Sequence, residues 1–361
     1  MPTVNPRGVV QSDIQVVLLQ RILASVYQDM LAKSTQGSLH TQARRLRFAK
    51  EVEEMMTVYR GDMQAWADIT VPNFYKEGMD RVVTEAIEQG IPLRLTDDFV
   101  KIHKEALNTL ITSGYTYIDN IVDGANATAR NLIDQAAREA IIEEVAKKRV
   151  TGEAQDKLVD KVESILKAKG VTTVTSNGRT YNAQSYAKML SRTLLTEAQW
   201  NGTRNQLAMD GHDLVIVSDH FGECKLCRPY ENEILSVNGM YPQYTRLDTA
   251  ISQGLKHSNC RHVIDPYYED FAKVSKVWDA KKQKYVPWEE AEPQNYNRAV
   301  NMDAKDKLKA YESFTSRIGL DDYQSINKAL NEGNKESLDY YARKAPTKRL
   351  TVAIRSLKKY V

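Results

Sequence analysis

Two short pairs of metal-binding side chains stand out in the sequence, and they contain all three cysteines of the chain. Cys224 and Cys227 are separated by two residues, a spacing that lets a tight turn direct two thiolates at one point. His257 and Cys260 repeat this spacing. Three thiolates and one imidazole form a tetrahedral ligand set that suits Zn²⁺. Because four protein ligands leave no open position for water or substrate, the pattern predicts a structural zinc site.

Two other states of the cysteines remain open from the sequence alone. The first is a set of three reduced, partly buried thiols that hold no metal. The second is a disulfide between Cys224 and Cys227. The disulfide is the less favoured of the two, because a small and odd number of cysteines is typical of a protein that folds in a reducing cytoplasm.

One hypothesis for the function of this segment is a small metal-dependent nuclease of the His-Asn-His type, and it is the alternative to the structural role described below. In such a site one histidine activates water while others hold a divalent ion beside the scissile phosphate. The residues that suggest it are Asp219, His220, Asn238 or Asn259, and His257 or His262. Their spacing fits the site poorly, and His257 cannot serve both zinc and catalysis.

The sequence motifs of serine hydrolases, P-loop NTPases, HExxH metalloproteases and zinc deaminases are missing. We therefore expect that the protein is not an enzyme.

The segment around the cysteines resembles a family of phage proteins. Its elements follow in a fixed order: Arg192-Thr193, a helical spacer through Trp200, a strand ending in Ser218-Asp219-His220, Cys224-x-x-Cys227, and His257-Ser-Asn-Cys260-Arg261-His262. This order is similar to the C-terminal module of the phage minor head protein family, also called phage minor capsid protein or Mu F-like head morphogenesis protein. The likeness is best over residues 186–266. Ser258 replaces a usual proline, and His262 stands where another cysteine is common.

The resemblance implies a structural protein of a tailed-phage head. Such proteins enter the procapsid near the portal in few copies and are implicated in head morphogenesis and in passage of the viral genome during packaging and ejection. The expected partners are the portal protein and a major capsid or scaffolding protein, with packaged double-stranded DNA as a further partner. The expected location is the virion head, in the procapsid interior, after assembly in the host cytoplasm.

Length and composition are those of a globular protein with no strong overall charge. A chain of 361 residues can form two domains with a well-buried core. A net charge of +3 excludes a strongly basic nucleic-acid binder as a whole. No stretch approaches the roughly 20 uninterrupted apolar residues that a membrane span requires. The N-terminus lacks the apolar core of a signal peptide. We therefore expect a protein that is made and folded in a cytoplasm.

The predicted fold class is α+β, with a mainly helical N-terminal half followed by a small α+β module that carries the Cys/His knuckle. We expect three domains: residues 1–150 with long helices for portal and capsid contacts, residues 151–270 with the Cys3His knuckle, and residues 271–361 with short helices and a basic tail.

Periodicity and turn signals place the individual elements. Apolar residues at spacings of three and four predict helices from Asp13 and from about residue 41. Pro72 predicts the end or a bend of the second helix, and a new helix near residues 71–73. From Phe99 the pattern fits either one very long helix or a broken pair. Further predictions are a short helix from Thr151, hairpins at 171–180 and 277–286, a helix over 186–209, strands at 214–217, 234–237 and 263–264, and helices over 303–318 and 322–330.

The last residues of the chain are strongly basic. After Asp339 there are seven Lys or Arg residues and no acidic one. This pattern fits a solvated face of the protein, and it also fits contacts with DNA phosphates or an acidic partner. The candidate nucleic-acid-binding residues are Arg261, Lys344, Lys348, Arg349, Arg355, Lys358 and Lys359.

Overall fold

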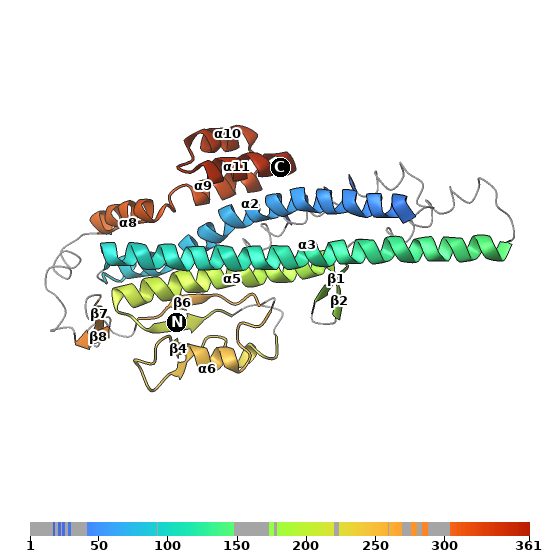
Figure 1. The fold of residues 1–361 in the computed structure, drawn as a ribbon. Helices are drawn as coiled ribbons and strands as arrows, with labels where there is room; N and C mark the ends of the chain where they lie inside the picture. Colours follow the sequence, from blue (N-terminus) through green and yellow to red (C-terminus); the bar gives the residue numbers. More distant parts are fainter. Residues whose placement is uncertain are drawn as a thin grey trace.

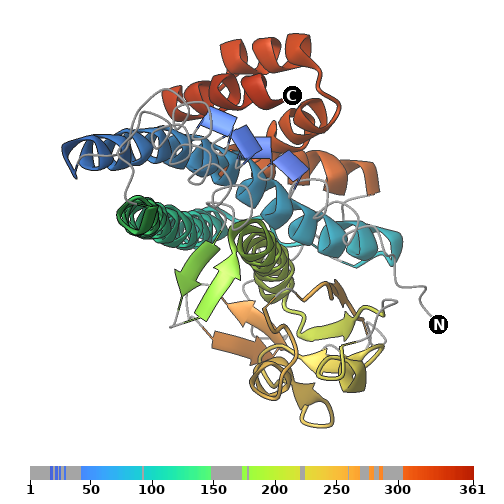
Figure 2. The ribbon, with the colours of Figure 1, turned by 90° about the vertical axis from the view of Figure 1, so that its right-hand side faces the viewer.

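Three long helices form the central layer of the molecule. The computed structural model describes residues 42–91, 93–147, 173–176, 179–219, 224–258, 260–268, 276–279, 284–287 and 304–361, together with short pieces between 17 and 29. The helices are α2 (Gln42–Glu88), α3 (Asp97–Lys147) and α5 (Ala183–Asp210), which lie side by side (Figure 1). A group of short C-terminal helices covers one face of this layer and a small sheet covers the other (Figure 2). The fold class is α+β, as predicted. The predicted N-terminal arm and the short helix from Thr151 lie outside the described residues.

Helix α2 is the centre of the fold and is buried on all sides along its middle. Every residue from Ala65 to Tyr75 is buried. A helix that is buried all round has no single apolar stripe, because neighbours cover each of its faces. Here α3 and α5 pack against it, and so do the C-terminal helices α9 and α11. The prediction of a new helix beginning near residues 71–73 is wrong, since Pro72 lies inside the continuous α2.

Helices α2 and α5 approach closely at two glycines. A Cβ atom added at Gly78 would overlap the carbonyl oxygen of Gln199 and lie 2.8 Å from the amide nitrogen of Thr203. A Cβ atom at Gly202 would overlap the carbonyl oxygen of Tyr75 in the same way. Each helix therefore presents bare backbone to the other at this crossing, and any side chain larger than hydrogen would push the two helices apart.

The long helix predicted from Phe99 is a single element, α3, rather than a broken pair. Both predicted hairpins are present as antiparallel strand pairs. One pairs β1 (Thr173–Ser176) with β2 (Arg179–Asn182), and the other pairs β7 (Lys276–Asp279) with β8 (Lys284–Pro287). None of the described helices is long and apolar enough to span a membrane.

The small sheet has four strands in the order β5-β4-β3-β6. Its strands are β3 (Leu214–Val217), β4 (Ile234–Ser236), β5 (Thr245–Arg246) and β6 (Ile264–Pro266), and β5 leads into the short helix α6 (Leu247–Ser252). Strand β3 is wholly buried and pairs antiparallel with both β4 and β6. The sheet packs on the helical layer through a second apolar cluster that includes Val82, Trp200 and Leu207. We call residues 212–268 the cysteine module.

The C-terminal residues form a helical cap on the opposite face. The cap consists of α8 (Ala304–Ile318), α9 (Tyr323–Asn331), α10 (Lys335–Lys344) and α11 (Lys348–Leu357), followed by a 3-10 turn, η4 (Lys358–Tyr360). We call residues 304–361 the C-terminal cap. Helices α8 and α9 match the helices predicted over 303–318 and 322–330. Helices α10 and α11 contain most of the basic residues at the end of the sequence. Asn334 and Thr347 begin these last helices as N-caps, since their side chains accept the backbone N–H groups of Ser337 and Leu350.

Candidate metal centre

Two backbone turns present the cysteines of the module. In the first, the amide nitrogens of Cys227 and Arg228 donate to the carbonyl oxygen of Cys224 at 3.1 and 3.0 Å, and a 3-10 turn, η1 (Arg228–Tyr230), follows. In the second, the amide nitrogen of Cys260 donates to the carbonyl oxygen of His257 at 3.0 Å. Both pairs predicted from the sequence are therefore closed by the same type of turn. The turns bring the two pairs to one place, and all three cysteines are free thiols.

The potential metal ligands form two overlapping groups that share Cys227. One group contains Cys224, Cys227 and His257, and the other contains Cys227, Cys260 and His262. Within each group the ligand atoms lie within 4.8 Å of one another. Four of these five residues are the predicted ligands. His262, which the sequence analysis did not place among the ligands, is the fifth.

The second group is the more deeply buried one. Cys227, Cys260 and His262 are all buried, whereas Cys224 and His257 are partly exposed. The Sγ atoms of Cys227 and Cys260 are 3.8 Å apart, and the Sγ atom of Cys260 is 3.3 Å from Nδ1 of His262. On its other side, Nε2 of His262 lies 2.8 Å from the carboxylate of Glu231, which is itself only 9% exposed.

Burial changes the acidity of the thiols. It raises the pKa of Cys227 to about 12, with a further contribution from the neighbouring Cys260. Burial also raises the pKa of Cys260. Two thiols in this environment stay protonated at neutral pH unless a cation compensates the charge of the thiolates. The donor set and the sulfur–sulfur distance fit a tetrahedral metal ion, and a bound Zn²⁺ would supply that compensating charge.

Helix α5 holds the second turn in place. The indole Nε1 of Trp200 donates to the carbonyl oxygen of His262 at 3.0 Å, and the hydroxyl of Thr196 donates to the carbonyl oxygen of Cys260 at 3.3 Å. Just after strand β3, the amide nitrogen of Ser218 donates to the carbonyl oxygen of Val263 at 2.9 Å. These contacts connect the candidate metal centre to the central helical layer, so the centre is an integral part of the fold.

The family model for phage minor capsid protein 2 matches residues 18–313 of the chain. This span covers the three long helices, the cysteine module and most of α8. The chain belongs to the phage minor capsid protein 2 family. It is therefore a phage capsid component with a structural role in the virion. A search of curated proteins and a search of solved structures gave no match.

Among the described residues named for a nuclease, His257 and His262 belong to the groups of potential metal ligands, whereas Asp219 does not. His220 and Asn259 lie outside the described residues. Asp219 accepts a hydrogen bond from Asn232 at 3.4 Å. His262 is fully buried between Cys260 and Glu231.

Three of the candidate nucleic-acid-binding residues bind carboxylates of the protein itself. Arg349 forms an ion pair with Asp68 on α2. Lys359 lies 2.7 Å from Asp62 on the same helix, and Lys358 pairs with Asp339 within the cap.

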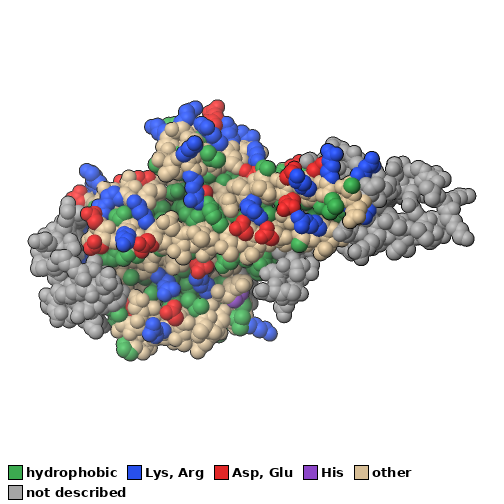
Figure 3. Space-filling view, in the orientation of Figure 1, with side chains coloured by type: hydrophobic (Ala, Val, Ile, Leu, Met, Phe, Trp, Pro, Cys, Tyr) green, Lys and Arg blue, Asp and Glu red, His purple; other side chains and the backbone are tan. Residues whose placement is uncertain are grey.

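The remaining candidates lie at the surface. Lys344, Lys348 and Arg355 are exposed, and Nζ of Lys344 lies 5.0 Å from the ring centre of Tyr340. Arg261 is partly exposed beside the cysteine turns. Lys and Arg side chains gather over the cap on the face shown in Figure 3.

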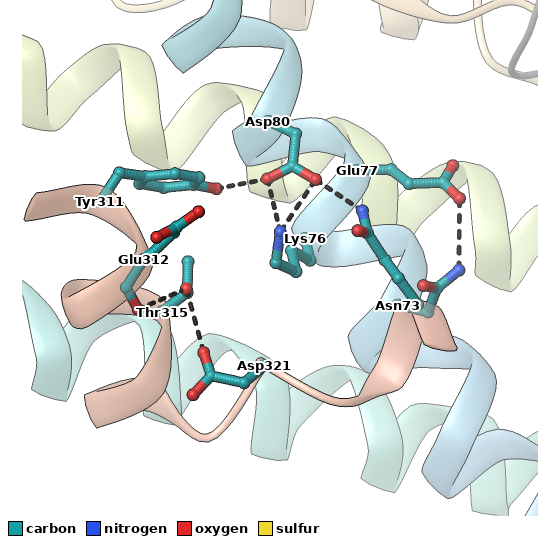
Figure 4. Close-up of polar contacts among 9 residues, drawn as sticks. Asn73, Lys76, Glu77, Asp80, Tyr311, Glu312, Thr315 and Asp321 are labelled. Atoms are coloured by element: carbon teal, nitrogen blue, oxygen red, sulfur yellow. Dashed lines mark hydrogen bonds and ion pairs between the residues drawn. The ribbon is translucent and has the colours of Figure 1, made fainter. Parts of the chain in front are cut away.

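Three acidic residues on α2 hold the cap, and the sequence analysis missed them. Asp62 accepts hydrogen bonds from the hydroxyls of Ser356 and Tyr360, and Asp68 binds Arg349. Asp80 lies 2.7 Å from the hydroxyl of Tyr311 on α8 and 2.8 Å from Nζ of Lys76 (Figure 4). A signal was present for Asp62 and Asp68, because both lie in the middle of α2 among apolar residues and a buried carboxylate needs a partner.

Proposed function

We propose that this minor capsid protein is a low-copy structural component near the portal, in the interior of the procapsid, and that it assists head assembly and DNA packaging or ejection. The observation that carries the proposal is the family match across the helical layer and the cysteine module. The exposed surfaces of α2, α3 and the cap provide long faces for the portal, scaffolding or major capsid protein. Assembly would take place in the host cytoplasm, where free cysteines persist.

The direct test is quantitative mass spectrometry on purified phage particles and on DNA-free procapsids. A few copies per particle in both preparations is the expected result. Absence from both preparations would contradict a role in the head. Presence in procapsids alone would overturn the ejection role and indicate an assembly factor of the scaffolding type.

Chemical cross-linking of intact procapsids tests the location. Cross-links to the portal protein are expected, and cross-links confined to the major capsid protein would contradict a location near the portal.

We further propose that the cysteine module holds one structural Zn²⁺ through its three cysteines and one histidine. The supporting observation is that two closed turns bring the sulfur and nitrogen atoms into two overlapping groups, the deeper of which is fully buried. Purified full-length protein should contain about one zinc per chain by elemental analysis, as a closed tetrahedral site requires. Folded protein that takes up no zinc after incubation with Zn²⁺ under reducing conditions would contradict this.

We also propose that the cap contacts packaged double-stranded DNA through its exposed basic residues. The ion pairs of Arg349, Lys358 and Lys359 weaken their candidacy, so Lys344, Lys348 and Arg355 are the main candidates. Binding to duplex DNA should weaken steeply with salt. Replacing these three residues with Gln should reduce the slope of log affinity against log salt by up to about 3. A flat salt dependence in the unmodified protein would contradict phosphate contacts.

A further inference from the structure

We propose that His262, oriented by Glu231, is the fourth ligand of the metal ion in the cysteine module, together with Cys224, Cys227 and Cys260. The inference rests on the zinc site proposed above and names its imidazole ligand. It differs from the expectation drawn from sequence spacing, in which His257 completes the site.

The distances around Cys260 are those of a tetrahedral site. Zinc lies about 2.3 Å from a thiolate and about 2.0–2.1 Å from an imidazole nitrogen, so two sulfur ligands are about 3.8 Å apart and a sulfur and a nitrogen ligand about 3.5 Å apart. The observed distance between the Sγ atoms of Cys227 and Cys260 is 3.8 Å. That between Sγ of Cys260 and Nδ1 of His262 is 3.3 Å. The ligand atoms of Cys227 and His262 lie within 4.8 Å of each other, so these three side chains can close on one ion, and Cys224 would reach it from the neighbouring group that shares Cys227.

Glu231 gives His262 the orientation of a metal ligand. Metal-bound histidines almost always donate their second ring N–H to a carboxylate, a carbonyl group or water, which selects the tautomer and orients the ring. Nε2 of His262 lies 2.8 Å from the carboxylate of Glu231. When Nε2–H donates to this carboxylate, the lone pair of Nδ1 faces Cys260. The imidazole is fully buried, so contacts within the protein rather than solvent hold its orientation.

His257 has a different environment. Its Nδ1 also has an orienting partner, the carbonyl oxygen of Ser258 at 2.7 Å, so orientation alone does not separate the two histidines. The difference is exposure, because His257 is partly exposed whereas His262 is buried. The backbone carbonyl of His257 also accepts the hydrogen bond that closes the turn at Cys260. His257 therefore has a structural part in forming the turn, and its side chain lies at the rim of the centre, where water competes for the metal.

The proposed ligand set connects the two turns in two ways, through the shared metal ion and through the contact between Glu231 and His262. Glu231 directly follows η1, the 3-10 turn that begins after Cys227. The first turn thus supplies two thiolates and the orienting carboxylate, while the second supplies one thiolate and the imidazole. Such a centre holds the η1 segment, which leads into β4, against the segment that leads into β6.

The test compares matched histidine variants of the full-length protein. The affinity for Zn²⁺ is measured by competition with a chromogenic chelator for His262→Ala, His257→Ala and Glu231→Gln, after circular dichroism has confirmed the helical content of each. We expect His262→Ala to weaken binding more than about 100-fold, Glu231→Gln about 10–100-fold, and His257→Ala less than about threefold.

Replacing either histidine with cysteine gives a second measurement, in which a thiolate takes the place of the imidazole and the site can still hold a metal ion. With Co²⁺ in place of zinc, the thiolate-to-cobalt charge-transfer absorption grows with the number of bound thiolates. In His262→Cys a fourth thiolate should raise this absorption by about one third over the three-thiolate site. In His257→Cys the absorption should not change.

Each result separates the ligand assignment from the zinc proposal. If His257→Ala loses the metal while His262→Ala keeps it, the assignment is overturned and the zinc site stands. Equal and small effects of both histidine variants overturn the assignment as well. A folded, unmodified protein that binds neither Zn²⁺ nor Co²⁺ overturns both proposals.

Discussion

The cysteine module and the C-terminal cap lie on opposite faces of the same helical layer and are held together in different ways (Figure 2). In the module, the potential metal ligands come from two short turns, each closed by its own backbone hydrogen bond. In the cap, the polar contacts with α2 join residues that are far apart in the chain. Arg349 and Asp68 are separated by 281 positions, and Ser356 and Asp62 by 294.

This difference explains why the two regions were not equally visible in the sequence. A turn that directs two ligands at one point needs only a fixed spacing, which can be read directly. A buried carboxylate on a central helix needs a cation or hydroxyl that can come from any part of the chain. The basic end of the sequence therefore resembled a solvated tail, although it supplies partners for Asp62 and Asp68.

Removal of the metal should have the largest effect and should be confined to the module. Given the proposed zinc site, chelation should lower the local stability of residues 214–266 by on the order of 5 kcal/mol. This is less than the roughly 10–16 kcal/mol found where metal binding drives folding outright, because the module retains an apolar cluster. Hydrogen exchange followed by mass spectrometry measures this. Peptides from α10 and α11 are the internal control, and equal loss of protection in both regions would contradict the comparison.

Substitution at the helix crossing should destabilise both regions together. Gly78→Ala should cost about 3 kcal/mol or more, because its methyl group would overlap the backbone of α5. Gly61→Ala in the same helix is the matched control. A Cβ atom there has no atom within 4 Å, so helix propensity should stabilise the protein by up to about 1 kcal/mol. Urea unfolding measures both changes, and similar values for the two variants would show that the crossing tolerates a side chain.

Acid should weaken the contact between the helical layer and the cap through His103. This histidine is fully buried, its Nδ1 lies 2.7 Å from the hydroxyl of Tyr75, and its ring packs against Phe314 of α8. Burial lowers its pKa from 6.5 to about 3. The unfolded chain therefore binds a proton between these values while the folded chain does not, so the contribution of His103 is complete above pH 6.5 and decreases below it.

The size of this effect can be isolated with a residue that does not titrate. From pH 8 to pH 5 the wild-type protein should lose up to about 2 kcal/mol more than His103→Gln in urea unfolding. His212 is the counterpart in the module. Burial, with a smaller contribution from Arg94, lowers its pKa to about 4, and its ring packs against Tyr268. If His103→Gln and wild type show parallel pH dependence, the histidine does not act as described.

Loss of one ion pair at the cap should have the smallest effect. Arg349→Ala should loosen α10 and α11 by about 1–2 kcal/mol, because Asp68 is only 11% exposed in its side chain whereas Arg349 is 58% exposed. Lys348→Ala, at the exposed neighbouring position, should change stability by less than about 0.5 kcal/mol. Limited proteolysis near residues 345–347 compares the two variants. Equal cleavage rates would indicate that helix packing alone holds the cap.

Much of the candidate metal centre could be read from spacing, but one part could not. The pairs Cys224–Cys227 and His257–Cys260 were visible, since each pair fits within one turn of the chain. Glu231 carried no signal, because it is 31 positions from His262 and only the pairing of β3 with both β4 and β6 brings their segments together. The structure also groups His262 with Cys227 and Cys260. The sequence held a signal for this, because His262 stands where another cysteine is common in the family, but spacing alone favoured His257.

The sequence alone determined the family, the fold class, most secondary-structure elements and the clustering of the cysteines, because each of these follows from local periodicity, turn chemistry or a short motif. Only the tertiary structure decided that Pro72 lies within one continuous helix, since packing on all sides can outweigh the local cost of proline. The tertiary structure also decided that residues at the basic end of the chain contact carboxylates of α2. Asp62 and Asp68 lie on a buried helix, and burial without a cation or hydroxyl partner would be costly for their charge. The sequence could not show that the last helices of the chain would supply these partners.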